Sequence, residues 1–151
     1  MMNWPQATKE WTAQLRGLRG GAPEVMKGFA GIAQAALAPK ALDAKTKELI
    51  ALAIAVAVRC DDCIAFHVKA ALDQGASEEE VTEALGIAIF MGAGSSVIYA
   101  SHALEAFHQV ANERSGGRAH EFGRQDKNEF RAISSRRPIT LGVPEARSPS
   151  V

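Results

Sequence analysis

Two cysteines, a histidine and a glutamate fall within one short stretch of this chain, at spacings that could support chemistry. The stretch runs ELIALAIAVAVRCDDCIAFH from Glu48 to His67 and is otherwise mostly apolar. Cys60 and Cys63 are the only cysteines in the sequence, so neither forms a disulfide with a distant cysteine of the same chain. A pair with this spacing is typical of thiol and disulfide chemistry or of a metal site.

The helical repeat determines which of these side chains lie together. If a helix begins near Cys60, the side chains of Cys60, Cys63 and His67 lie along one face, at positions i, i+3 and i+7. Two cysteines at i and i+3 have Cα atoms about 5 to 6 Å apart, which a disulfide accepts, so we predict a reversible bond within one chain. His67 is then placed to take a thiol proton. Glu48 is the candidate to orient His67, provided that the chain reverses near Arg59.

The same residues resemble the signature of a known family. Glu48, then eleven residues, then Cys60-Asp61-Asp62-Cys63, then three residues and His67 resemble the pattern of the AhpD-like alkylhydroperoxidases of the carboxymuconolactone decarboxylase superfamily. The flanking sequence is similar to that family from roughly residue 22 to residue 110. The resemblance implies an all-α, compact helical domain that is oligomeric, with the CxxC pair at the start of a central helix. It also implies that Cys60 and Cys63 reduce peroxides and that Glu48 and His67 relay protons to the thiols.

One position departs from the family pattern. Several well-studied members carry a histidine or a tyrosine directly before the second cysteine, where this chain has Asp62. A carboxylate beside a thiol disfavours the thiolate. We therefore expect Asp62 to weaken the peroxidase chemistry while leaving the redox pair in place.

Other interpretations of the motif stay open at this point. The cysteines could be inert core residues, although two aspartates between them favour contact with water. Zinc could be bound by Cys60, Cys63 and His67, with Glu48 as a fourth ligand, but no second CxxC pair supplies the distant half of a structural site. We therefore expect no metal and no cofactor. Two further functions also stay open. The protein could exchange disulfides with another redox protein, or it could be a non-redox member of the superfamily that acts on lactones.

Length and composition fit a small enzyme subunit. A chain of 151 residues, 47% hydrophobic and 6% aromatic, supports a single core. The N-terminal residues lack the pattern of a secretory leader, so we expect a cytoplasmic protein whose thiols are reduced at rest. The longest apolar run, residues 49–58, is too short to span a bilayer, and we expect no membrane partner.

Charge divides the chain into two parts. Residues 1–111 hold nine Lys and Arg against twelve Asp and Glu, whereas residues 112–151 hold eight against five. We predict a helical domain over residues 1–111 and a flexible basic tail over residues 112–151, because the second part has few apolar residues and no sustained period. Its cations are interleaved with anions and lack an aromatic pattern, so nucleic acid is not an expected partner.

Within the first part, apolar periodicity and capping residues predict five or six helices and no strand. From residue 81 to residue 98 apolar side chains occupy nearly every face, which one small domain can hardly cover. We therefore expect a homo-oligomer, a trimer or hexamer by the resemblance, with a peroxide substrate and a dithiol or redox-protein reductant. We assign no chemistry to His102 and His108, which do not share a helix face. The predicted helices are residues 4–19, 23–37, a third capped by Asp43, 60–74, and 77–111 with a kink at residues 92–94.

Overall fold

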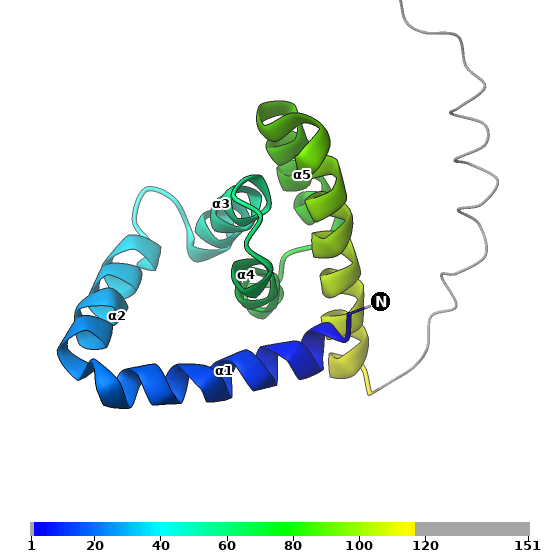
Figure 1. Cartoon of the computed structure of the whole chain (residues 1–151). Helices are drawn as coiled ribbons and strands as arrows, with labels where there is room; N and C mark the ends of the chain where they lie inside the picture. The colour runs from blue at the N-terminus through cyan, green and yellow to red at the C-terminus, as the bar shows by residue number, and fades with distance from the viewer. Residues whose placement is uncertain (1, 117–151) are drawn as a thin grey trace, which may run out of the picture. The chain divides into compact units, whose positions relative to one another are not determined.

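The computed structural model describes residues 2–116, and in that range the chain forms five helices and no strand. The expected all-α class is confirmed. The predicted tail, residues 112–151, begins inside the last helix, and from residue 117 on it lies outside the described residues. The helices, shown in Figure 1, are α1 (Trp4–Gly21), α2 (Pro23–Leu37), α3 (Ala44–Ala57), α4 (Asp61–Asp73) and α5 (Glu78–Arg114).

Local capping residues explain where α3 and α5 begin. The Asp43 carboxylate accepts the Thr46 N–H at 2.7 Å. Ser77 accepts the Glu80 N–H at 3.2 Å, and the Glu80 carboxylate accepts the Ser77 N–H at 2.9 Å, which completes a capping box. The salt bridge from Lys45 to Glu80, at 2.6 Å, then links the start of α3 to the start of α5. This bridge and the Ser77 N–H lower the pKa of the Glu80 carboxyl.

The core lies between α3, α4 and α5, with the N-terminal end of α1 packed against α4 and α5. Trp4 has the largest fully buried side chain, and its backbone N–H donates to the Gln109 side-chain oxygen on α5 at 2.8 Å. Most of the remaining core is built from small or branched side chains, as the sequence composition predicts. The best-buried branched residues are Leu52, Val56, Ile64, Val68 and Val81.

The far end of α1 and all of α2 lie at the edge of this core. Among the five described helices, α2 contacts only α1 and α3, and none of its side chains is buried. Figure 1 shows α2 apart from α4 and α5. Trp11, Leu15 and Leu18 recur at helical spacing on α1, but only the first two are half-buried, and Leu18 is 53% exposed. The reason is that α1 extends beyond the helices it packs against.

The long helix α5 contains the predicted kink. Ala93 has φ 53° and ψ −147°, a non-helical conformation, and it stands between Gly92 and Gly94. Gly92 is required for close packing, since a Cβ there would lie 1.9 Å from the Ser96 hydroxyl oxygen. Sequence reasoning located the kink, but the residue with positive φ is the alanine and not one of its glycine neighbours.

By length and composition alone, α5 is apolar enough to cross a membrane. Its apolar residues are interrupted by glycines, serines and a histidine, so no single apolar run in the sequence marks it. Core helices of water-soluble proteins pass the same test, and α5 supplies nine buried residues to the described core and starts with three glutamates. We therefore read α5 as a helix of the bundle.

Candidate active site

The predicted chain reversal near Arg59 is confirmed, and its hydrogen bonds identify it as a Schellman motif. Arg59 adopts φ 61°, the left-handed conformation that commonly ends a helix. Its N–H donates to the Val56 carbonyl at 3.2 Å, and the Cys60 N–H donates to the Ala55 carbonyl at 3.0 Å. The end of α3 thus places Cys60 at the start of the next helix.

Cys60 is the N-cap of α4. Its backbone is extended, with φ −107° and ψ 95°, and its Sγ accepts the Cys63 N–H at 3.3 Å. Cys60 and Cys63 are joined by a disulfide, with their Cα atoms 5.2 Å apart, within the separation expected for positions i and i+3. Both residues are half-buried, so the pair is in contact with solvent. Inert burial of the cysteines is therefore excluded.

Glu48 and His67 meet across α3 and α4. His67 Nδ1 lies 2.8 Å from Glu48 Oε2, and Glu48 is only 8% exposed. The two lysines that flank Glu48 in sequence bind elsewhere: Lys45 pairs with Glu80, and Lys47 donates to the carbonyls of residues 36 and 38. Glu48 is therefore not a solvated surface carboxylate but a buried one whose partner is the imidazole.

This hydrogen bond defines the state of the imidazole. An ionised carboxylate can only accept, so Nδ1 carries the proton that the bond requires, and Nε2 is left to accept or give a second proton. His67 stands one helical turn after Cys63, on the same face of α4. The arrangement can hold a base close to the second sulfur.

Carboxylates also surround the first turn of α4. Asp61 and Asp62 occupy its first two positions, where the N–H groups of a helix start favour negative charge. Asp62 is exposed, whereas the Oδ1 atom of Asp61 is buried against His102 of α5. Sequence reasoning missed this contact, because it depends on how α4 and α5 pack.

No group of three or more His, Cys, Asp or Glu side chains among residues 2–116 is arranged to hold a metal ion. In the disulfide state the two sulfurs are bonded to each other and do not offer thiolates to zinc. The donor set of the zinc interpretation is therefore not assembled in this state.

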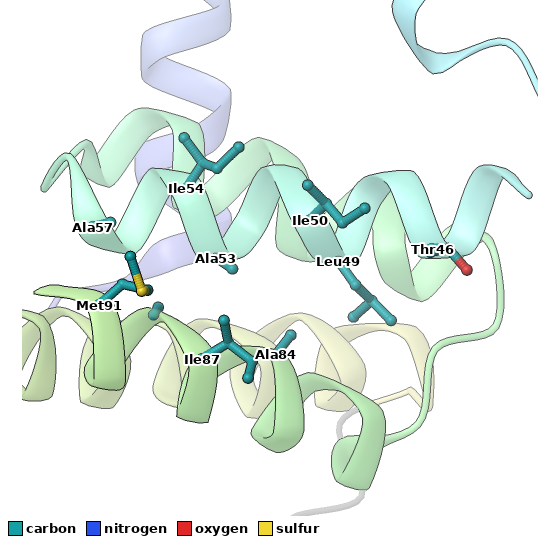
Figure 2. A pocket seen from close by; sticks show the side chains of 10 residues that line it. Thr46, Leu49, Ile50, Ala53, Ile54, Ala57, Ala84, Ile87 and Met91 are labelled. Atoms are coloured by element: carbon teal, nitrogen blue, oxygen red, sulfur yellow. The ribbon is translucent and has the colours of Figure 1, made fainter. Parts of the chain in front are cut away.

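An apolar cavity of about 330 Å³ lies between α3 and α5, away from these residues. Figure 2 shows Leu49 of α3 directed toward α5 and Ile87 and Met91 of α5 directed toward α3, while Ile54 points away. None of the four candidate site residues lines the cavity. It therefore belongs to the packing of α3 on α5, and not to the redox pair.

Comparisons with known proteins agree on one family. A family model described as "Carboxymuconolactone decarboxylase family" matches residues 23–106, which include all four candidate residues. An uncharacterized protein from Cupriavidus necator is 46% identical over 85 residues, 56% of this chain and 75% of that protein. Another from Haemophilus influenzae is 40% identical over 85 residues, again 56% of this chain and 75% of that protein.

Two solved structures are similar to the chain. A carboxymuconolactone decarboxylase family protein from Legionella pneumophila is 48% identical and has a TM-score of 0.70, covering 72% of this chain and 96% of that one. A protein of the same family from Thermotoga maritima, for which a part in the antioxidative response has been suggested, is 31% identical. Its TM-score is 0.66, covering 74% of this chain and 96% of that one.

We predict that oxidation closes the Cys60–Cys63 bond within one chain. Trypsin should release residues 60–69 as one peptide, and after hydroperoxide treatment its mass should correspond to the loss of two hydrogens from the reduced form. The Cys60→Ser protein should not show this loss. Disulfide-linked dimers as the main oxidised product would contradict the prediction.

Proposed function

Because the chain belongs to the carboxymuconolactone decarboxylase family, we propose that it is a thiol-dependent peroxidase that reduces hydroperoxides, organic ones included, in antioxidant defence. The observation that carries the proposal is the CxxC pair at a helix start with a buried carboxylate–imidazole pair one turn away. Such an enzyme works in a compartment that keeps thiols reduced, which favours the cytoplasm.

In the first step the Cys60 thiolate attacks one oxygen of the hydroperoxide. An S–O bond forms, the O–O bond breaks, and the leaving alkoxide takes a proton to become an alcohol. Cys60 is then a sulfenic acid. We assign the attack to Cys60 because its Sγ lies at the N-terminus of α4, where the Cys63 N–H points at the sulfur and stabilises negative charge.

In the second step Cys63 resolves the sulfenic acid. Its thiolate attacks the Cys60 sulfur, the S–S bond forms, the S–O bond breaks, and the hydroxide takes a proton to become water. An external dithiol or redox protein then reduces the disulfide by thiol exchange. The structure corresponds to the oxidised end of this cycle.

His67 moves the protons of this cycle. Its Nε2 takes the proton of the Cys63 thiol and gives it to the leaving oxygen, while Glu48 holds Nδ1–H and stabilises the imidazolium that forms. These two roles explain why the carboxylate of Glu48 is buried on the inner face of α3.

A second candidate function is exchange of disulfides with other proteins, without specificity for peroxide. The observation that favours it is that Cys60 and Cys63 are both half-buried and in contact with solvent, where the thiol of a partner can reach them. Both candidates use the same two sulfurs and differ in the oxidant.

Turnover of cumene hydroperoxide with dithiothreitol tests the first candidate. We expect the protein to be active and both Cys60→Ser and Cys63→Ser to fall to the uncatalysed rate, because each removes one sulfur of the cycle. Reduction of insulin disulfides is measured in parallel. Insulin reduction that depends on the cysteines, together with background peroxide turnover, would establish the second candidate and reject the first.

The relay predicts non-additive effects of Glu48→Gln and His67→Gln. Each should slow alkylation of the Cys63 thiol by iodoacetamide near neutral pH, by about 10²-fold or more, and the double variant should be little worse than either. The reason is that Glu48 has nothing to orient once His67 is lost. Glu83→Gln, which removes an exposed carboxylate from α5, is the matched control and should leave the rate unchanged. If the alkylation profiles of both Glu48→Gln and His67→Gln overlay that of the wild type, the relay does not exist.

We also propose that the protein is a homo-oligomer, because the described chain leaves apolar faces uncovered. On α2, Val25, Phe29 and Ile32 are 71%, 63% and 69% exposed and recur at helical spacing. On α5, Phe90 and Met91 are 81% and 73% exposed, beside the apolar cavity against α3. A helix stripe and an apolar surface on the same molecule fit a second copy as the partner.

Light scattering of the whole chain should give a multiple of 16.1 kDa, and the resemblance favours three or six copies. Phe29→Glu should reduce the mass because it places a charge in the apolar stripe of α2. Lys27→Glu, on the opposite face of the same helix, is the control and should not. A mass of one chain at micromolar concentration, or recovery only with detergent or lipid vesicles, would contradict this proposal.

A further inference from the structure

A second carboxylate and imidazole meet beside the redox pair. Asp61, the residue after Cys60, places Oδ1 3.5 Å from Nδ1 of His102. The two residues come from α4 and α5. They belong to neither the Glu48–His67 hydrogen bond nor the disulfide, and the proposed cycle gives them no role.

The facing atoms are buried and make no hydrogen bond within the described part of the chain. Asp61 Oδ1 and His102 Nδ1 are both inaccessible to solvent, and their separation exceeds a normal hydrogen bond. A buried polar atom without a hydrogen bond is costly. Attraction between a carboxylate and an imidazolium at this distance offsets part of that cost. The two groups form an ion pair when the imidazole is protonated.

Two aromatic rings also lie beside His102. Its ring centroid lies 6.3 Å from that of Trp4 on α1 and 5.2 Å from that of Tyr99 on α5. The titratable groups close to it are the phenol of Tyr99 and the carboxylate of Glu105, one turn along its own helix, and Asp61 of α4, which Cys60 and Asp62 flank in sequence. Asp61 is the one acidic group within ion-pair distance of His102 in the described part of the chain.

We propose that His102 is a positioning residue for Cys60, acting through Asp61. This inference rests on the proposed function, since it concerns the sulfur assigned to attack the peroxide. Asp61 and Asp62 both place negative charge in the turn that holds Cys60, and that charge opposes formation of the thiolate. His102 compensates the charge of Asp61 and fixes the direction of its carboxylate.

The two carboxylate–imidazole pairs then serve different sulfurs. Glu48 and His67 act on Cys63, which is one turn before His67 on α4. Asp61 and His102 act on Cys60, which directly precedes Asp61. The second pair also addresses the negative charge of the two aspartates in the CxxC segment, because an imidazole from α5 faces one of the two carboxylates.

The test follows the alkylation of Cys60 alone, in a Cys63→Ser background, by iodoacetamide across a range of pH. His102→Phe keeps a ring against Trp4 and Tyr99 but removes the charge. We expect it to move the midpoint of the profile to higher pH by about one unit. His108→Phe is the matched control, because His108 also lies on α5 and pairs at 3.0 Å with a carboxylate, that of Glu78. It should leave the midpoint unchanged.

Two aspartate variants test whether the effect passes through Asp61. In an Asp61→Asn background, His102→Phe should move the midpoint by less than half as much as in the parent. In an Asp62→Asn background the full shift should persist. An equal shift in the two backgrounds would overturn the proposed route through Asp61.

The outcomes for this inference and for the proposed function are distinguishable. If His102→Phe leaves the Cys60 profile unchanged while His67→Gln slows alkylation of Cys63 in a Cys60→Ser background, the inference is wrong and the relay stands. If only the His102 variant has an effect, the inference stands and the relay falls. Thermal unfolding checks each variant, and His102→Gln replaces His102→Phe if the latter does not fold. An unchanged Cys60 profile in His102→Gln would overturn the inference.

Discussion

The buried carboxylate of Glu48 is the constraint on which the site depends. A charge in the interior is tolerated only with a partner that satisfies it, and His67 supplies that partner at 2.8 Å. The bond joins α3 to α4 and therefore requires the chain to turn back within the few residues around Arg59. That requirement places Cys60 and Cys63 at the start of α4, where a helix end stabilises thiolate charge.

The features that sequence reasoning predicted are those encoded by neighbouring residues. Asp43, Ser77 and the spacing of Cys60 from Cys63 act within one turn, so caps, helix positions and the Cα separation of the cysteines followed from local rules. The Glu48–His67 contact needed one further assumption, the reversal, which the Schellman motif satisfies. Contacts between α4 and α5 depend on the register of two packed helices, which no local pattern specifies. For that reason Asp61 and His102 were not connected in advance.

The distribution of side-chain size explains why the same chain carries a buried site and open apolar faces. Alanines at many core positions let α3, α4 and α5 approach closely. Gly92 has the same effect where α5 lies beside α3. Larger apolar side chains are thereby displaced to the outside, among them Phe29 and Phe90. The small residues in the core and the large apolar residues on the surface thus have the same origin in the composition of the chain. Association between copies would bury the apolar side chains that the core leaves exposed.

The Schellman motif at Arg59 has a consequence for the energetics of repeated turnover. Cys60 donates its N–H to the Ala55 carbonyl at the end of α3 at 3.0 Å, and its own carbonyl accepts the Ile64 N–H of α4 at 2.9 Å, so its backbone is bound to two helices independently of the disulfide. Breaking the S–S bond then leaves the main chain of the CxxC segment ordered. The conformational entropy of this loop is lost once, when the protein folds, and does not have to be lost again each time the sulfurs reconnect.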